Sequence, residues 1–497
     1  MGKLWQRWRE FRKSDRWRRA WPVRHRRKLV TVFIIFAHVV GALTSVKAVM
    51  ETRTSQGAVA WVVSLNTFPY LAVPAYWVFG RSEFRGYVIA RQGGLRESQA
   101  LENELRNRLA NEQLVEVEKP ETNRLLERLA QMPFTRRNSV RVLVDGGDTF
   151  DAVFKAIDEA QSYVLFQSFI IRDDRLGNEL RERLERRARA GVRVLVLYDE
   201  VGSHGLTRRY RRSLEEAGVK VSPFNTTQGA ANRFQINFRN HRKIVVVDGR
   251  VAFVGGANVG DEYVDGGRFG NWRDTHVMMR GPVVQTVQVP FAEDWYWATR
   301  ELLLDLDWDP EPAAADVAAL CLPSGPADPF ETCALMFLTA INTARERVWI
   351  ASPYFVPDES IMAALQLAAL RGVDVRVLLP NDPDHKLVYL SSFSYLEPAE
   401  KAGVKIYRYK PGFMHQKVML VDHSHAAIGT ANLDNRSFRL NFEITMVFDD
   451  AGVNRDIAVM LEEDFSRSRQ VSATEYSESS FPFRLAVQLA RLTAPVQ

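Results

Sequence analysis

Cysteine is almost absent from this chain of 497 residues, in which Cys321 and Cys333 are the two examples. Neither belongs to a CxxC pair or lies beside histidines at the spacing of a zinc site. This scarcity excludes a disulfide framework and favours a reducing compartment. The chain also lacks the bias of a disordered protein, because 46% of its residues are hydrophobic and 25% are charged. Such a composition supports two or three domains with hydrophobic cores.

Excess positive charge is missing from most of the chain, although the formal net charge is +6. The first 28 residues contain twelve lysines and arginines against Glu10 and Asp15, a local balance of +10 that leaves −4 for the remainder. A body of that charge argues against nucleic acid as a partner. The basic arm over residues 1–28 also carries interleaved tryptophans, which suits contact with anionic membrane lipids or simply follows the positive-inside rule.

Long uncharged runs occur near the N-terminus. Leu29 to Val46 is a run of 18 residues with His38 as its one titratable group, and Ala58 to Phe79 is a run of 22 residues without charge. A helix of 18 residues spans about 27 Å, just enough for the hydrocarbon core of a bilayer. Pro69 and Pro74 predict a kink in the second run. The two runs therefore predict a transmembrane helical hairpin.

The distribution of basic residues orients this hairpin. Twelve precede the first run, Lys47 and Arg53 lie between the runs, and four follow the second run before residue 97. The positive-inside rule then predicts a multi-pass protein of the cell (inner) membrane, with both termini and the catalytic region in the cytoplasm. A cleaved signal peptide is the alternative for the first run. The expected segments are a basic cytoplasmic arm (1–28), the hairpin (29–79), a helical linker (80–135) and two further regions (136–320 and 321–497).

The last two regions repeat each other. The string AGVRVLVLYDE at Ala190–Glu200 matches RGVDVRVLLPN at Arg371–Asn381, and EEAGVKV at Glu215–Val221 matches EKAGVKI at Glu400–Ile406. Short β-branched runs alternate with longer helical stretches in each copy, which is typical of α/β folds. The repeat predicts two α/β sandwich halves related by a pseudo-twofold axis.

Each half contains the motif H-x-K-x(4)-D, followed by a glycine and an asparagine. The five residues fall at offsets 0, 2, 7, 14 and 17 in both copies. They are His241, Lys243, Asp248, Gly255 and Asn258 in the first half, and His415, Lys417, Asp422, Gly429 and Asn432 in the second. At about 5% usage of each residue type, one such pattern arises by chance on the order of 10⁻⁷ times per start position. Two copies in matching repeats are therefore no accident.

The motif suits chemistry on a phosphate diester. On a strand, His and Lys two residues apart project from the same face, and the pseudo-twofold axis brings both pairs together. One histidine can then attack phosphorus while the other transfers protons. The lysines, with Asn258 and Asn432, can hold the phosphate oxygens in the way that a metal does elsewhere. We therefore expect no metal and no other cofactor.

A nucleophilic histidine needs a carboxylate on its far ring nitrogen. Asp274 and Glu443 follow the two motifs at similar places. We expect Asp274 to orient His241 and Glu443 to orient His415. Asp248 and Asp422 complete the two catalytic motifs, but their position at strand ends beside turns favours a structural role over a catalytic one.

Paired H-x-K-x(4)-D motifs resemble those of the phospholipase D superfamily. Longer strings are similar to bacterial cardiolipin synthases of the membrane-anchored kind, namely NWRDTHV (271–277), SPYFVPD (352–358) and GTANLDNRSFRLNFE (429–443). The resemblance implies transfer of a phosphatidyl group between two phosphatidylglycerol molecules, which gives cardiolipin and glycerol. It further implies His241 as the nucleophile and His415 as the general acid and base, although the pseudo-symmetry leaves that assignment reversible.

Other functions use the same motifs. A phospholipid hydrolase passes through the same covalent intermediate and differs in whether water is excluded. A phosphatidylserine-forming transferase and a nuclease are further alternatives, and the membrane segments and the charge of the body argue against the nuclease. An inactive lipid-binding scaffold is a fourth alternative, although both histidines and both lysines are present. The sequence leaves the oligomeric state open.

Overall fold

The computed structural model describes residues 26–80, 84–93, 95–225, 227 and 237–497. The chain divides into two units, one formed by residues 1–83 with 234–237 and the other by residues 84–233 with 238–497. The predicted basic arm lies almost wholly outside the described residues. Both predicted α/β halves lie in the larger unit.

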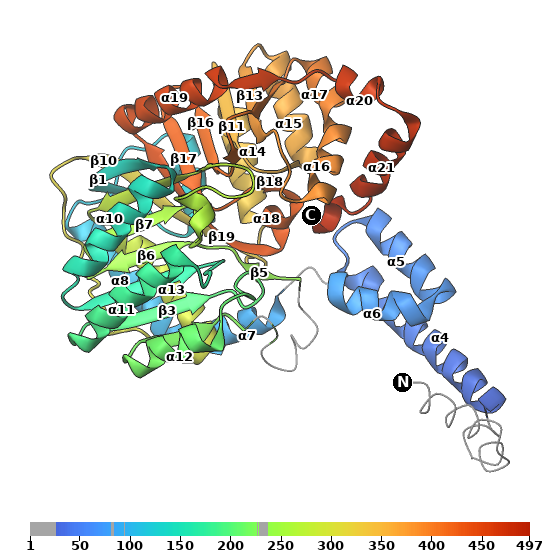
Figure 1. Ribbon diagram of the computed structural model, residues 1–497, viewed down its shortest axis with the longest axis horizontal. Coiled ribbons are helices and arrows are strands. Elements are labelled where there is room, and N and C mark those ends of the chain that lie inside the picture. The colour runs from blue at the N-terminus through green and yellow to red at the C-terminus, as the bar shows by residue number, and fades with distance from the viewer. Residues whose placement is uncertain (1–25, 81–83, 94, 226, 228–236) are drawn as a thin grey trace. The chain divides into compact units, whose positions relative to one another are not determined.

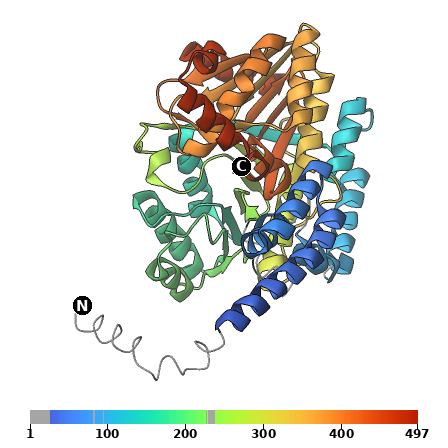
Figure 2. The same cartoon turned by 90° about the vertical axis from the view of Figure 1, so that its right-hand side faces the viewer.

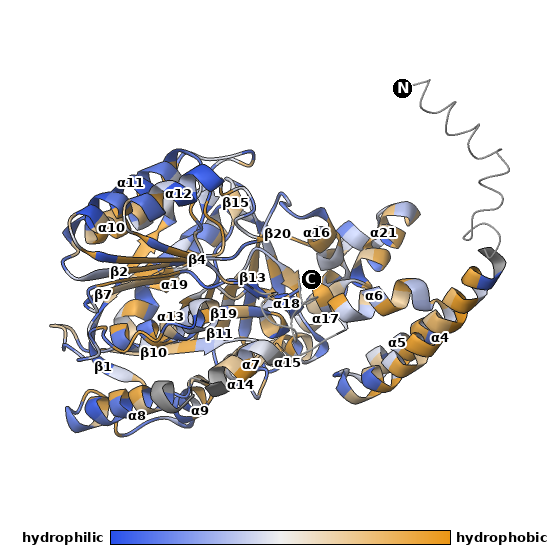
Figure 3. Cartoon of the chain, turned by 90° about the horizontal axis from the view of Figure 1, so that it is seen from below, coloured by the Kyte–Doolittle hydropathy of each residue, from blue (hydrophilic) through white to orange (hydrophobic). Residues whose placement is uncertain are grey.

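The smaller unit contains α4 (Arg26–Glu51), α5 (Ser55–Thr67) and α6 (Pro69–Phe79). Figure 3 shows α4 as apolar along most of its length. Within the described part of the chain, Lys28–Glu51 is the one helical stretch that is long and apolar enough to cross a membrane. The first predicted span is therefore a helix of the expected kind.

The second apolar run is divided between α5 and α6. The backbone leaves the helical region at Phe68 (φ −132°, ψ 57°), and Pro69 begins the next helix. Proline is tolerated at a helix start because its missing N–H has no acceptor there. The predicted kink is thus a break between two short helices, and the predicted two-helix hairpin is not confirmed.

Helices α4 and α5 nevertheless pack closely. The Asn66 side-chain amide donates to the Ser45 hydroxyl at 2.8 Å. A Cβ atom added at Gly41 would lie 2.2 Å from the carbonyl oxygen of Leu65. Glycine at this position therefore allows the backbones of the two helices to approach each other.

One sheet of sixteen strands forms the centre of the larger unit. The first half contributes the order β4-β3-β2-β6-β7-β9-β1 and the second half the equivalent order β14-β13-β11-β16-β17-β19-β10. The first-half strands are β1 (Thr135–Val144), β2 (Tyr163–Ser168), β3 (Arg193–Tyr198), β4 (Lys220–Pro223), β6 (Ile244–Val247), β7 (Val251–Gly255) and β9 (Thr275–Arg280). The second-half strands are β10 (Val317–Ser324), β11 (Arg347–Ala351), β13 (Asp374–Pro380), β14 (Lys405–Tyr409), β16 (Val418–Val421), β17 (His425–Gly429), β19 (Asn441–Asp449) and the edge strand β20 (Ser468–Gln470).

Strands β1 and β10 pair in antiparallel fashion and join the two half-sheets into one. The predicted repeat of two α/β halves is therefore confirmed, and the halves share a continuous sheet (Figures 1 and 2). Strand β2 is buried along its whole length. Helices cover both faces of such a sheet, so its inner strands are continuous apolar runs.

The helices repeat in the same manner. The first half has α10 (Asp145–Glu159), α11 (Arg175–Arg189), α12 (Arg208–Glu216) and α13 (Val283–Thr299). The second half has α14 (Thr332–Thr343), α15 (Glu359–Leu370), α16 (Lys386–Ser392), α17 (Leu396–Ala402), α18 (Asn435–Arg439), α19 (Ala451–Ser466), α20 (Thr474–Ser477) and α21 (Phe481–Arg491). Asp174 caps α11 and Asp358 caps α15, each by accepting a backbone N–H three residues later. The equivalent helices α11 and α15 therefore begin in the same way in both halves.

The predicted linker contains α7 (Arg85–Gly93), α8 (Leu95–Asn111) and α9 (Glu121–Ala130). Tyr87, Leu109 and Leu126 are buried in the same core as the sheet strands. The Tyr87 hydroxyl also donates to Asp294 of α13 at 2.9 Å. This segment is therefore an integral layer of the larger unit, and the term linker does not describe it.

Candidate active site

Both motif histidines follow short strands that cross from one half to the other. His241 follows β5 (Arg239–Asn240), which pairs with β19 of the second half. His415 follows β15 (Phe413–Met414), which pairs with β8 (Trp272–Arg273) of the first half. The two crossings are equivalent, so the pseudo-twofold axis passes between the motifs and brings them into one site.

Each histidine is bonded to a carboxylate of the opposite half. His241 Nδ1 lies 2.8 Å from Glu443 Oε2, and His415 Nδ1 lies 2.7 Å from Asp274 Oδ2. The predicted pairing of Asp274 with His241 and of Glu443 with His415 is therefore wrong. The reason is the strand crossing, which places each histidine beside the strand of the other half that carries the carboxylate.

The two carboxylates are held differently. Glu443 accepts from the hydroxyls of Thr430 at 2.6 Å and Ser437 at 2.8 Å, and from the Asn441 amide at 3.1 Å. Asp274 accepts from the backbone N–H of the next residue at 2.7 Å. Glu443 is thus fixed by three side chains, and Asp274 by the main chain.

Glycine occupies the first-half position that corresponds to Thr430. Gly256 and Thr430 both stand 15 residues after their motif histidine. A Cβ atom at Gly256 would lie 2.1 Å from an oxygen of Asp274. Asp274 therefore takes the space that a threonine side chain fills in the second half.

The motif lysines lie beside their own histidines. Lys243 Nζ donates to the backbone carbonyl of His241 at 2.7 Å. Lys417 Nζ contacts the carbonyl of His415 and lies 2.7 Å from its ring Nδ1 and 3.1 Å from Nε2. Burial, together with the neighbouring Lys417, lowers the pKa of Lys243 to about 7, and burial lowers the pKa of Lys417 to about 8. Two buried ammonium groups in one site attract an anion.

Both imidazoles are neutral at physiological pH. Burial lowers the pKa of His241 to about 4, even though Glu443 opposes this shift. Burial and the two motif lysines also lower the pKa of His415. A neutral His241 ring that donates Nδ1–H to Glu443 keeps a lone pair on Nε2, the form that nucleophilic chemistry requires. Nδ1 of His415 lies 2.7 Å from both Asp274 and Lys417.

The predicted phosphate-binding asparagines lie in the site but bond to protein groups. Asn258 donates to the Tyr263 hydroxyl at 2.9 Å and accepts from the Ile170 N–H at 3.2 Å. The side-chain amide of Asn432 lies 3.4 Å from Asp434, and its Oδ1 atom has no hydrogen-bond partner among the described residues. Phosphate binding by Asn258 and Asn432 remains a prediction.

The motif aspartates bond to backbone N–H groups. The Asp248 carboxylate accepts from the three consecutive N–H groups of Gln161–Tyr163, at 2.7, 2.7 and 2.8 Å. Asp422 accepts in the same way from the N–H groups of Arg345–Arg347. Both aspartates have left-handed backbone conformations, with φ of 54° and 49°. They anchor the chain before β2 and β11, and within the described part of the chain no hydrogen bond joins either of them to a motif histidine. These contacts favour the structural role over the catalytic one, and both remain predictions.

Several residues of the site were not predicted. The Tyr263 hydroxyl lies 3.3 Å from His415 Nδ1, and the Phe169 ring meets the His241 ring edge to face at 4.9 Å. Tyr263 and Ser437 each stand 22 residues after their motif histidine. A longer comparison of the repeats would therefore have marked these two positions, whereas nothing in the sequence singles out Phe169.

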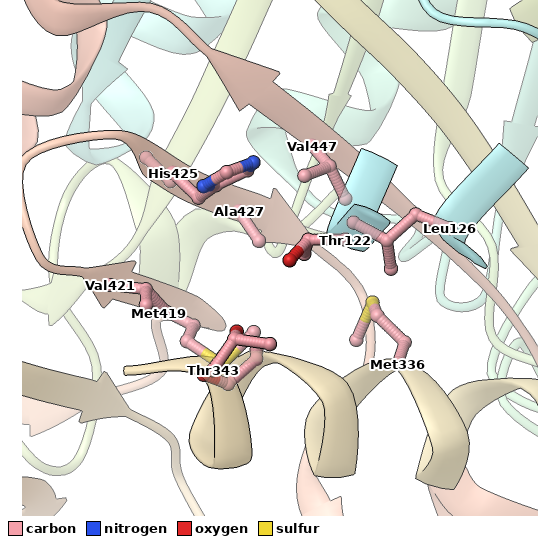
Figure 4. Close-up of a pocket in the computed structure, with 11 residues that line it drawn as sticks. Thr122, Leu126, Met336, Thr343, Met419, Val421, His425, Ala427 and Val447 are labelled. Carbon is pink, nitrogen blue, oxygen red and sulfur yellow. Dashed lines mark hydrogen bonds between the residues drawn. The ribbon is translucent and has the colours of Figure 1, made fainter. Parts of the chain in front are cut away.

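A cavity of about 360 Å³ lies away from the two motifs, between α9, α14 and the strands β16, β17 and β19 (Figure 4). Its walls are largely apolar, with Leu126 and Met336 on opposite elements. His425 lines it, but the ring of this histidine bonds to Asn123 of α9 at 2.8 Å. The residues around this cavity include no lysine or carboxylate, so we assign it to the packing of α9 and α14 on the sheet.

Comparison with known proteins identifies the family. The family model described as "Cardiolipin synthase, PLD-like domain" matches residues 153–295 and 337–468, more than half of the chain. The chain belongs to the cardiolipin synthase family. Cardiolipin synthase A of Pseudomonas fluorescens is 48% identical over 476 residues, which cover 94% of this chain and 98% of the relative. Cardiolipin synthase A of Pseudomonas aeruginosa is 48% identical over 472 residues, which cover 94% and 96%.

The predicted family is thus confirmed, and with it a membrane-associated phosphatidyltransferase of the cardiolipin synthase type. Among solved structures, phosphatidylserine synthase from Haemophilus influenzae aligns with a TM-score of 0.55 and 14% identity, and covers 76% of this chain and 100% of its own. At that identity the likeness shows a shared fold.

Proposed function

We propose that this cardiolipin synthase family member transfers a phosphatidyl group from one phosphatidylglycerol to another through a phosphatidyl-histidine. The observation that carries the proposal is the crossed pair of hydrogen bonds, His241 to Glu443 and His415 to Asp274. The bond to Glu443 holds the His241 ring by Nδ1 and leaves its Nε2 available to a phosphate, while Lys417 lies beside the His415 ring. When the phosphate binds between the two buried lysines, their ammonium groups supply the positive charge that stabilises the transition state.

In the first step, Nε2 of His241 attacks phosphorus. A P–N bond forms, the P–O bond to the headgroup glycerol breaks, and His415 gives a proton to the departing glycerol oxygen. Within the described part of the chain, no group hydrogen-bonds to Nε2 of His241, whereas Lys417 Nζ lies 3.1 Å from Nε2 of His415. This difference supports His241 as the nucleophile.

In the second step, His415 takes the proton from the terminal hydroxyl of a second phosphatidylglycerol. That oxygen attacks phosphorus, the P–N bond breaks, and cardiolipin leaves with His241 restored. The negative charge of the bound diester favours the protonated form of His415 before the first step, and the loss of that proton to glycerol leaves His415 neutral and ready to act as the base. Water in place of the second lipid would give phosphatidic acid, which is the hydrolase alternative.

The test is an assay of the purified protein in detergent with phosphatidylglycerol as the sole lipid. We expect glycerol and a four-chain product, undiminished by EDTA, with thin-layer chromatography and mass spectrometry as the readouts. His241→Ala and His415→Ala should each abolish turnover, while His423→Ala, at an exposed position, should not. Phosphatidic acid as the sole product, or full activity of either histidine variant, would overturn the proposal.

We also propose a multi-pass protein of the inner membrane, with α4 as one crossing and α5 with α6 as the other, and with both termini and the catalytic region cytoplasmic. The support is the charge bias, because the basic residues gather before α4 and Lys47 and Arg53 alone lie between the runs. Ser55 and Ser480 are exposed, and both native cysteines are buried. A membrane-impermeant maleimide applied to spheroplasts should label Ser55→Cys directly and Ser480→Cys only after permeabilisation. Equal labelling of both variants would contradict this topology.

A further inference from the structure

The second half contains a cavity of about 280 Å³ between α16 and the ends of β13 and β14. The polar and aromatic residues that line it are Tyr354, Asp384, His385, Tyr389, Ser392 and Arg408.

Backbone pairing places this cavity beside the catalytic motif of the same half. Strand β12 (Phe355–Val356) pairs with β18 (Leu433–Asp434), which directly follows Asn432. The Ser352 hydroxyl, just before the cavity, accepts from the Leu433 N–H at 2.9 Å. Ser352 and Lys417 also line one small cavity together. The cavity therefore lies next to the segment that follows the second motif.

Arg408 is a buried cation without a counter-ion in the described part of the chain. Its side chain is almost fully buried, with the residue 1% exposed. The guanidinium donates to the Pro380 carbonyl at 3.0 Å and lies 4.6 Å and 5.0 Å from the rings of Tyr389 and Phe393. It also donates to the Ser392 hydroxyl at 3.5 Å, and among the described residues its Nε atom has no hydrogen-bond partner. Glu475 acts on this charge from a distance, but no carboxylate pairs with it directly, so the site favours an anionic occupant.

Other buried arginines of this protein have carboxylate partners. Arg242 pairs with Asp294 at 3.0 Å, and Arg273 pairs with Asp464 at 2.9 Å. In the first half, the position that corresponds to Arg408 is Pro223. Arg408 therefore differs from these two buried arginines, and the first half has no arginine at the equivalent position.

Asp384 lines the same cavity. Its carboxylate accepts from the Tyr354 hydroxyl and the His385 N–H, each at 2.7 Å, which leaves acceptor capacity unused. Burial lowers the pKa of Lys417, and the charge of Asp384 is among those that oppose the shift. A carboxylate and a buried cation in the same cavity are complementary to the hydroxyls and the phosphate of a headgroup.

We propose that this cavity holds the headgroup of the acceptor phosphatidylglycerol, with Arg408 on its phosphodiester and Asp384 on its glycerol hydroxyls. The inference rests on the proposed function and deepens it. In the acceptor, three carbon atoms separate the attacking hydroxyl from the lipid's own phosphate. That second phosphate must therefore lie outside the centre that holds the phosphatidyl-histidine.

The surroundings of the cavity favour a lipid over free phosphate as the source of the anion. Helix α16 packs against α21, where the rings of Phe393 and Phe483 meet at 5.2 Å. The outer face of α21 exposes four large apolar residues, with exposed fractions between 47% and 76%. They are Phe481, Leu485, Leu489 and Leu492. An apolar stripe beside an anion site suits the acyl chains of a phospholipid at a bilayer surface.

The test compares two acceptors on the same covalent intermediate. Cardiolipin formation uses phosphatidylglycerol as the acceptor, whereas exchange of labelled glycerol into phosphatidylglycerol uses glycerol, which has no phosphate. We expect Arg408→Met to lower kcat/KM for cardiolipin formation about 10-fold to 100-fold, the usual effect of losing a hydrogen bond to a charged group. Exchange of glycerol should stay within about threefold of the native rate.

Arg408→Lys keeps the charge and should lose less, again in cardiolipin formation alone. Arg376→Met is the matched control, because this arginine lies on β13 and pairs with Asp374 outside the cavity, so both reactions should be unchanged. Equal loss of both reactions in the methionine and lysine variants, or no loss in either, would overturn the acceptor site. Protection of the native protein from heat by inorganic phosphate, with cardiolipin formation insensitive to Arg408→Met, would assign the cavity to free phosphate instead. Absence of cardiolipin from the native protein would refute the proposed function itself.

Discussion

The two halves share one backbone plan but support their carboxylates in different ways. Glu443 is held by two hydroxyls and an amide from its own half, and it orients His241. Asp274 is held by the main chain and lies against Gly256, and it orients His415. A duplicated scaffold has therefore produced two histidines in unequal surroundings, which is what two different chemical roles require.

The different surroundings of the two histidines match the different roles proposed for them. A nucleophile must keep one ring position through the formation and the breakdown of a covalent bond, and three side-chain bonds to Glu443 restrict its movement. An acid and base must instead change its protonation state twice in each cycle, and Lys417 next to the His415 ring makes its imidazolium a stronger acid. The following predictions test this comparison between the halves.

The largest expected difference is between Glu443→Gln and Asp274→Asn in the first step alone. With a phosphatidyl ester of p-nitrophenol, the leaving group needs no proton, so the first step depends on the nucleophile. Glu443→Gln should slow nitrophenol release on the order of 10³-fold, as expected when a histidine loses its orienting carboxylate. Asp274→Asn should leave the rate of nitrophenol release in the first turnover within about threefold of the native rate, measured by stopped-flow absorbance. The opposite result would make His415 the nucleophile.

The pH dependence of kcat/KM should fall at low pH because of a first-half histidine and at high pH because of one lysine from each half. Below about pH 4 His241 becomes protonated and cannot attack, and above pH values of about 7 and about 8 Lys243 and then Lys417 lose the charge that binds phosphate. We expect a loss of roughly tenfold per pH unit above 7 and a steeper loss above 8. Initial rates in constant-ionic-strength buffers measure the profile, and a flat line from pH 7 to pH 9 would contradict it.

A smaller effect is expected from the hydroxyl that only the second half possesses. Thr430→Val removes one bond to Glu443 and should lower kcat about tenfold, whereas Thr430→Ser keeps the hydroxyl and should stay near the native rate. Steady-state assays on phosphatidylglycerol provide the measurement. Equal activity of the valine and serine variants would show that this bond does not position His241.

The smallest effect on turnover is expected from the motif aspartates. Asp248→Asn and Asp422→Asn weaken equivalent bonds to three backbone N–H groups, while asparagine tolerates the left-handed conformation. Each variant should lose about 1–2 kcal/mol of unfolding free energy and keep the native kcat per folded molecule. Thermal unfolding followed by circular dichroism, alongside active-site titration, separates the two quantities. A hundredfold lower kcat at an unchanged Tm would restore a catalytic role.

The repeat predicted much of the fold because it combines local signals. The apolar run after each motif became β6 and β16, and the turn at each motif aspartate leads into β7 and β17. The break at Phe68 could not be predicted from hydropathy, since proline is tolerated both within a membrane helix and at the start of a new one.

The pairing of histidine with carboxylate failed for a different reason. Asp274 stands 33 residues after its motif histidine and Glu443 stands 28 residues after its own, so each looked like a local partner. The actual partners are fixed by β5 and β15, which have two residues each and belong to sheet pairs between the halves. Strands of that length carry no periodic signal, and their partners depend on the tertiary fold.

The junction of β1 with β10 has a consequence for the origin and engineering of the molecule. Cut apart there, each half would carry a bare strand edge together with a histidine whose carboxylate partner lies on the missing fragment. Neither fragment could complete a reaction centre alone, yet the same edge offers a way for complementary fragments to reassociate. Inheriting the halves as one polypeptide fixes their stoichiometry and lets each diverge without losing its counterpart.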